Sequence, residues 1–427
     1  MFRPLDVRAG EAPNLRQAQP VVACTATPRL AHTIAVGRHP IALALDAQTR
    51  RAFVRNSDGT VSVLDLTHDT VLGAVTVSAP AAQPVEGHVE NENASARGLA
   101  VDVRTARVFV TTGGAITVLD ATSGTLLRRV PLGAAPFALA ADERHNYVFA
   151  IRYGNAVSML DATSGALLHT EHLRRQPRAI AVDQRTARVF VTTYGAVHVL
   201  DARSGVQVRS LDGVTPIAEF IGVDEATSRV FLTGRGGGIY IPKPGGGAVV
   251  KSVSMLDARD GTLLRSLGTA QGYHNASVSS LVVDEPARRV LIVGGSVSVF
   301  DARSGAVLIN RRLPRHGPGG EATAAAVDAR RGCLYVPIAY EEPATNAQSG
   351  TVSVVDVATA RVVTTIPIGG LLLSATVDPP TGQVLILNSN DPANPTGPNG
   401  SVSVLGATPP AGHGSGGAPS CSDRPAC

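Results

Sequence analysis

The chain has 427 residues, of which 44% are apolar and only 4% aromatic, and its formal net charge is +4 at pH 7. This composition supplies enough apolar side chains for a continuous core, and so small a charge without a basic run argues against a nucleic-acid partner. No run is long and apolar enough to predict a transmembrane helix.

The first segment, residues 1–29, is expected to be disordered, and it lacks the apolar core of a signal peptide. Its letters VVAC, which end at Cys24, faintly resemble a lipoprotein cleavage site, but the apolar run that should precede such a site is missing. The sequence therefore leaves the location of the protein open.

Residues 30–405 are filled by a repeat of four short apolar runs. Its clearest copy is ARGLAVDVRTARVFVTTGGAITVLDATSGTLLRRVPLG, residues 96–133. A period of roughly 40–50 residues with four strands per unit is typical of a β-propeller. Eight copies of the first run predict eight blades, with seven as the alternative because seven is commoner in similar proteins. In each copy the first run is expected to be the innermost strand and the fourth the outermost.

The two ends of the repeat are expected to meet. Residues 30–37, LAHTIAVG, have the pattern of a fourth run, whereas the last copy, residues 372–405, supplies only the first three. We therefore expect LAHTIAVG to be the outer strand of the last blade, which closes the ring. The prediction is an all-β protein with a single propeller at 30–405.

An aspartate ends the first run of every copy, and a large apolar residue follows each one seven positions later. A catalytic group is not needed eight times, so we expect these side chains to close tight turns by bonding nearby amides. A second aspartate ends the third run and is followed by Gly in five copies, as in Asp120 and Gly124, which is typical of a hairpin loop. The first-run aspartates are Asp46, Asp102, Asp142, Asp183, Asp224, Asp284, Asp328 and Asp378.

The remaining cysteines and the C-terminal tail carry little signal for chemistry. Cys333 lies inside a strand pattern and is expected to be a small core residue. Cys421 and Cys427 could close a short loop if the compartment is oxidising. Residues 406–427 are rich in Gly, Pro and Ser and are expected to be disordered, so deleting 408–427 should change stability little.

The connections that vary in length are those between the second and third runs and those between units. In an up-and-down blade both kinds emerge on the same face of the disc, and binding residues concentrate on such loops. Three histidines in the inserts, with nearby carboxylates, could hold a divalent metal or could be solvated loop residues. Five positions before the first-run aspartates, Arg97 and Arg178 could bind an anion, or pair with Glu219. The candidate ligand-binding residues, expected around one depression at the axis, are Arg97, Arg178, Glu219, His88, His274, His316, Tyr340 and Glu341.

With its units aligned, the chain resembles the YVTN-type β-propeller repeats of bacterial and archaeal surface proteins. The stretches that carry the resemblance are RVFVTTGGAITVLDATSGTLLRRVPLG, RVFVTTYGAVHVLDARSG and GTVSVVDVATARVVTTIPIGG. The resemblance implies an extracytoplasmic binding or surface-associated protein and no shared catalytic motif. The absent signal peptide departs from that expectation.

These observations favour a non-enzymatic binding or scaffold propeller, monomeric, whose insert-bearing face takes a protein, peptide or polysaccharide. The alternative is a metal-dependent lyase or hydrolase, similar to lactonases, that uses His88, His274 and His316 on the same face. No cofactor is expected in the first case, and a divalent metal in the second.

Overall fold

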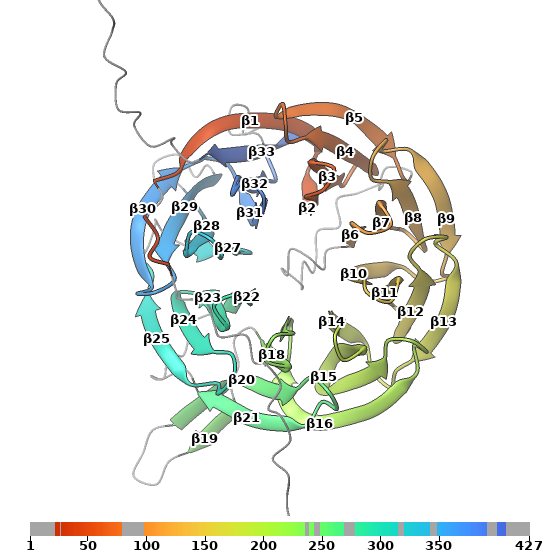
Figure 1. The fold of residues 1–427 in the computed structure, drawn as a ribbon, viewed down its shortest axis with the longest axis vertical. Coiled ribbons are helices and arrows are strands. Elements are labelled where there is room, and N and C mark those ends of the chain that lie inside the picture. The colour runs from red at the N-terminus through yellow and green to blue at the C-terminus, as the bar shows by residue number, and fades with distance from the viewer. Residues whose placement is uncertain are drawn as a thin grey trace, which may run out of the picture.

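The computed structural model describes residues 22–25, 27–78, 98–234, 239–242, 248–268, 278–314, 320–341, 348–390 and 399–406. Its strands form eight sheets arranged as blades around one axis (Figure 1). Within these ranges there is no helix, and hence none that could cross a membrane. The prediction of an all-β propeller with eight blades is confirmed, and the alternative of seven is wrong.

In each blade the strands follow one another from the axis to the rim (Figure 1). The strands of blades one and two are β2 (Pro40–Asp46), β3 (Arg51–Asn56), β4 (Thr60–Asp65), β5 (Thr70–Thr76), and β6 (Leu99–Asp102), β7 (Arg107–Thr112), β8 (Ala115–Asp120), β9 (Leu126–Pro131). Those of blades three and four are β10 (Pro136–Asp142), β11 (Tyr147–Arg152), β12 (Ala156–Asp161), β13 (Leu167–His172), and β14 (Pro177–Asp183), β15 (Arg188–Asp201), β16 (Gln207–Ile217). In blade four the second and third runs form one continuous strand, β15.

The other half of the ring carries two additions to the repeat: β19, which pairs only with β20, and β26, which lies beside β27 on β28. The strands of blades five and six are β17 (Phe220–Asp224), β18 (Arg229–Thr233), β19 (Ile239–Pro242), β20 (Ala248–Asp257), β21 (Leu263–Gly268), and β22 (Val278–Asp284), β23 (Arg289–Gly294), β24 (Ser296–Asp301), β25 (Val307–Arg312). Those of blades seven and eight are β26 (Glu321–Ala322), β27 (Ala326–Asp328), β28 (Cys333–Glu341), β29 (Gln348–Asp356), β30 (Arg361–Pro367), and β31 (Leu372–Val377), β32 (Val384–Asn388), β33 (Asn399–Gly406), β1 (Arg29–Arg38).

The ring is closed by β1, which pairs antiparallel with β33 and places Ile34 opposite Val402. Ile34 and Val36 are buried in a cluster that also contains Leu387 of blade eight and Leu43 of blade one. The predicted closure by the N-terminal strand is therefore confirmed. The first and last strands of the chain lie side by side in blade eight (Figure 1).

The core lies between neighbouring blades. Phe53 of blade one is completely buried and packs in a cluster with Val108 and Leu119 of blade two. Phe109 of blade two packs in the same way with Val148 of blade three. Each large residue seven positions after the first-run aspartate thus joins its own blade to the next, so the ring is one continuous hydrophobic structure.

A disulfide between Cys24 and Cys333 fixes the segment before β1 to blade seven. The Cys24 amide donates to Asp356 Oδ1 at 3.3 Å, and both cysteines lie in a buried cluster with Tyr335 and Ile366. The expectation for Cys333 needs correction: it is buried as predicted, but it is cross-linked to a residue 309 positions away. Cys24 therefore has a packed position inside the segment that was expected to be disordered, whereas its neighbours Val22, Ala23 and Thr25 are exposed.

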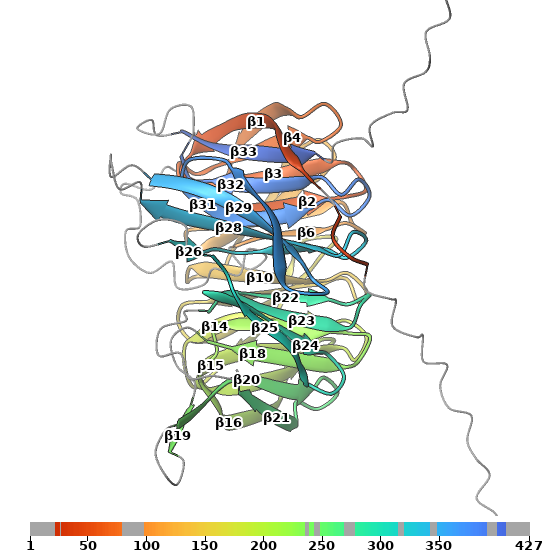
Figure 2. The same cartoon turned by 90° about the vertical axis from the view of Figure 1, so that its left-hand side faces the viewer.

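The ring has two distinct faces, seen from the side in Figure 2. The turn face carries the two aspartate turns of each blade, and the insert face carries the connections between second and third strands and between blades. The hairpin of β19 and β20 projects from the insert face, on the left of Figure 2. The segment before β1 meets blade seven on the turn face, next to the aspartate turn that ends at Cys333.

Candidate functional site

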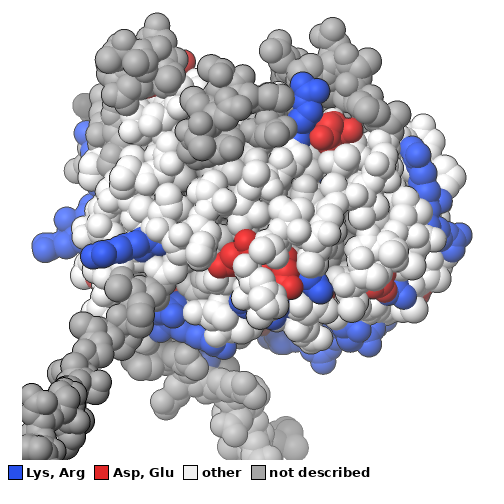
Figure 3. All heavy atoms as spheres, turned by 90° about the horizontal axis from the view of Figure 1, so that it is seen from above, with Lys and Arg blue, Asp and Glu red and all other residues white. Residues whose placement is uncertain are grey.

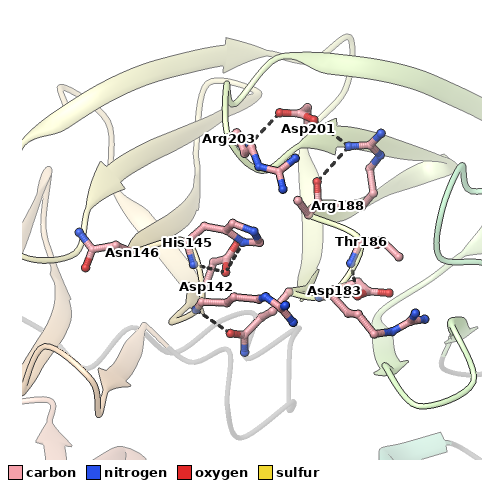
Figure 4. Close-up of polar contacts among 12 residues, drawn as sticks. Asp142, His145, Asn146, Asp183, Thr186, Arg188, Asp201 and Arg203 are labelled. Carbon is pink, nitrogen blue, oxygen red and sulfur yellow. Dashed lines mark hydrogen bonds and ion pairs between the residues drawn. The ribbon is translucent and has the colours of Figure 1, made fainter. Parts of the chain in front are cut away.

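The first-run aspartates act as predicted, as turn residues of the turn face (Figure 4). All eight are buried. Asp183 Oδ1 accepts hydrogen bonds from the amides of Arg185 and Thr186, both at 2.9 Å. The Thr186 hydroxyl adds a contact that the repeat did not reveal, because it donates to the carbonyl of Ala258 in the next blade at 2.9 Å. These turns therefore fix both the local hairpin and the spacing of the blades.

Four of the second aspartates, Asp65, Asp120, Asp201 and Asp257, pair with an arginine of the preceding hairpin. The distance from Arg188 Nη1 to Asp201 Oδ2 is 2.7 Å (Figure 4), and the equivalent pair in blade two, Arg107 and Asp120, is 3.0 Å apart. The hydrogen bond from the Ser123 amide lowers the pKa of Asp120 below its ordinary value. In the edge-on view of Figure 3, Lys and Arg side chains gather along the lower margin, which is the turn face. Since its charged groups bond one another and the backbone, we assign the turn face a structural role.

On the insert face, the structure brings together two of the candidate residues, Arg178 and Glu219. Arg178 belongs to β14 and Glu219 immediately precedes β17, in the adjacent blade. Arg178 Nη1 lies 3.8 Å from Glu219 Oε1, and both side chains are mostly buried beside the axis. Of the two interpretations left open by the sequence, the ion pair is the one observed. An anion at Arg178 would have to compete with the Glu219 carboxylate.

Tyr340 and Glu341 lie at the insert-face end of β28, in blade seven. Tyr340 is paired with Ser349 of β29, and the Ser349 hydroxyl donates to Tyr340 Oη at 3.4 Å. Glu341 is exposed opposite Gln348. These two residues share the insert face with Arg178 and Glu219 but belong to a blade on another part of the ring. Their assembly around one depression stays a prediction.

The other candidates, Arg97, His88, His274 and His316, lie outside the described residues. Across the ranges that are described, His, Cys, Asp and Glu side chains form no group of three or more that could hold a metal ion. The divalent-metal hypothesis depends on the three histidines of the inserts, and it stays a prediction. Stoichiometric metal in the purified protein is the measurement that would support it.

Two exposed tyrosines on the insert face were missed by the sequence analysis. Tyr153 follows β11 in blade three, and Tyr194 occupies the equivalent hairpin in blade four, inside β15. The ring of Phe137 lies 5.1 Å from that of Tyr153. The sequence did contain a signal for these two residues. Both occupy the same place in the repeat, immediately before Gly154 and Gly195, in a chain with only seven tyrosines.

His198 is the one buried titratable side chain in a column that is otherwise serine or threonine. It lies on β15, and the same position of the other third strands holds Ser62, Thr117, Ser158, Ser254, Ser298, Ser353 or Ser403. Its Nδ1–H donates to Gln207 Oε1 at 2.7 Å, and its Nε2 accepts from the Thr193 hydroxyl at 3.3 Å. Burial lowers the pKa of His198 below its ordinary 6.5, against the opposing effects of Gln207 and Asp212.

His198 is expected to make the protein less stable in mild acid. The unfolded chain binds a proton on this imidazole near its ordinary pKa of 6.5, whereas the folded protein binds it only at lower pH. The stability that the neutral His198 contributes is therefore fully present above pH 6.5 and is lost as the pH falls below that value toward the lower pKa of the folded protein. Between pH 7.5 and pH 5.0 we expect Tm to fall more in the natural protein than in His198→Ser, which carries the serine of the other blades. Equal falls in both proteins would contradict this assignment.

Comparisons with known proteins agree with this architecture. The profile of a family described as outer membrane protein assembly factor BamB matches residues 57–212 and, in a second overlapping match, residues 113–329. Among solved structures, BamB from Moraxella catarrhalis is 14% identical, covers 89% of this chain and 100% of its own, and superposes with a TM-score of 0.56. The β-propeller domain of Cps50 (Swd1) from Myceliophteria thermophila is 14% identical, with coverages of 73% and 96% and a TM-score of 0.50. At 14% identity the two solved structures show the fold alone. A search of curated proteins gave no match.

Proposed function

Because the chain belongs to the protein family described as outer membrane protein assembly factor BamB, we propose that it is a non-enzymatic scaffold whose insert face binds a partner protein. The name of the family points to assembly rather than to a reaction. A peptide or a polysaccharide as the ligand is the alternative within the same binding role.

The observation that carries this proposal is the contrast between the two faces. The turn face repeats the same short hydrogen-bonded turns in successive blades, with the eight first-run aspartates buried and four of the second aspartates paired with an arginine. The insert face differs from blade to blade, with the projecting β19 hairpin in blade five and long strands β28 and β29 in blade seven. A rigid ring with dissimilar loops on one side suits recognition of a large partner.

The disulfide supports an oxidising, extracytoplasmic compartment as the place of work. Disulfides form and persist outside the reducing cytosol. The Cys24–Cys333 bond joins buried atoms of the ring, so it belongs to the folded core rather than to a loose tail. In this state the Cys24 sulfur is bonded to Cys333 and cannot carry a lipid. The finer resemblance to YVTN-type surface proteins points to the same compartment.

A photo-crosslinking experiment tests the scaffold role. A photoreactive amino acid replaces Glu341, which is exposed on the insert face, or Thr122, which is exposed on the turn face, and each variant is produced in the native host. We expect a discrete adduct with one partner from position 341 and none from position 122. No adduct from 341, or the same adducts from both positions, would contradict a partner on the insert face.

A further inference from the structure

The insert face of blades three and four carries a strip of aromatic and cationic side chains, which we name the tyrosine strip: Phe137, Tyr153, Arg174, Arg175 and Tyr194. Tyr153 and Tyr194 are 58% and 55% exposed, and in the described part of the chain they are the only exposed aromatic side chains whose burial is known. Phe137 is half-buried beneath Tyr153 at a tilted angle of 49°. Exposed aromatic rings held in place by neighbours are typical of binding surfaces.

The connection between the two blades holds the tyrosine strip in a fixed shape. Gln176 Nε2 donates to the carbonyl of Arg152, beside Tyr153, at 3.2 Å. Arg175 donates from its guanidinium to the carbonyl of Tyr194 at 2.6 Å. The two tyrosine hairpins are thus both bonded to residues 173–176, the connection between β13 and β14. A ligand would therefore meet a surface that is already ordered, and less conformational entropy would be lost on binding.

The charge of the tyrosine strip is positive. Arg174 and Arg175 are both exposed, and no carboxylate among the described residues lies within ion-pair distance of either. Three acidic groups lie near the strip: Glu219 pairs with Arg178, Glu171 contacts His169, and the exposed Asp212 of β16 lies opposite Ala196, close enough to His198 to act on it together with Arg174. Two arginines against the single exposed carboxylate of Asp212 leave the strip with an excess of positive charge. Arginine guanidinium groups bind carboxylates in bidentate geometry and retain donors after making one bond.

We propose that the tyrosine strip is the docking site for an acidic, extended segment of a partner protein. Tyrosine and arginine are the residue types that contribute most at protein interfaces, and here they alternate across two neighbouring blades. Carboxylates of the segment bind Arg174 and Arg175, and its apolar side chains lie on Tyr153 and Tyr194. The segment runs from blade to blade because the tyrosines occupy equivalent hairpins of successive blades. This inference rests on the proposed scaffold function and names the chemistry of the partner.

The test uses a display library of random twelve-residue peptides, selected on the immobilised full chain in low salt. We expect the enriched peptides to be rich in Asp and Glu with interspersed apolar residues, and to bind less tightly as NaCl is raised. In Tyr153→Ser/Tyr194→Ser and in Arg174→Ala/Arg175→Ala, fluorescence anisotropy should show affinities about tenfold weaker or worse, as for residues worth more than about 1.4 kcal/mol. Arg203→Ala/Arg259→Ala, which removes two exposed arginines of the turn face, is the matched control and should bind normally.

Other outcomes overturn the inference. Enriched peptides that are neutral or basic would do so, and so would equal losses in the turn-face control. Polygalacturonate is assayed in parallel, since binding of this polymer through the tyrosine strip without acidic peptides would assign the strip to a sugar acid. The photo-adduct from position 341 separates the two proposals: if it forms while acidic peptides fail, the scaffold function stands and the tyrosine strip is not its docking site.

Discussion

Deleting residues 1–38 is expected to open the ring at blade eight and to lower the free energy of unfolding by more than about 5 kcal/mol. The deletion removes β1, which buries Ile34 and Val36, each worth about 1.5–3 kcal/mol. It also removes the Cys24–Cys333 disulfide and leaves the edge of β33 unpaired, and an exposed strand edge promotes association. Denaturant unfolding and size-exclusion chromatography measure the two consequences.

The control for this experiment is deletion of residues 408–427, for which we expect the full-length Tm. A second variant, Ile34→Ala, keeps both the strand and Cys24 and should cost about 2–5 kcal/mol, because it empties a buried site between blades eight and one. A protein without residues 1–38 that stays monomeric and melts like the full chain would show that β1 is not needed to hold the ring closed.

Reduction of the Cys24–Cys333 disulfide is expected to lower the free energy of unfolding by about 2–5 kcal/mol. The bond links residues 309 positions apart, so it restricts the unfolded chain strongly and disfavours it relative to the folded ring. Without any reductant, Cys24→Ser should have the same lowered free energy of unfolding as the natural protein has in the presence of a thiol-free reductant. Thermal and denaturant unfolding with and without the reductant provide the measurement.

Cys24→Ser is also the control for the reductant, which should lower the Tm of the natural protein and leave the Tm of the variant unchanged. Mass spectrometry of the unreduced protein identifies the bonded pair directly. Free thiols at Cys24 and Cys333 in folded protein, or a Tm that does not respond to the reductant, would contradict a stabilising cross-link.

Much of the architecture could be predicted because it repeats. The eight aspartate turns and the large residues such as Phe53 and Phe109 recur at fixed spacings, and each copy makes the same turn and the same packing contact with the next blade. The closing strand was also visible, since the last copy lacked its fourth run and residues 30–37 supplied one. The candidate site was harder to predict from the sequence, because a binding site depends on residues that occur in one blade and not in the others.

The sequence by itself determined the local elements: the strand periodicity, the turn chemistry and the number of blades follow from residues close together in the chain. Only the tertiary structure decided which distant side chains meet. Cys24 reaches Cys333 and Arg178 reaches Glu219, because the closed ring brings the segment before β1 to blade seven and places blade four beside blade five. Spacing along the chain encodes hydrogen bonds within a hairpin, whereas contacts between blades depend on the radius and closure of the whole ring.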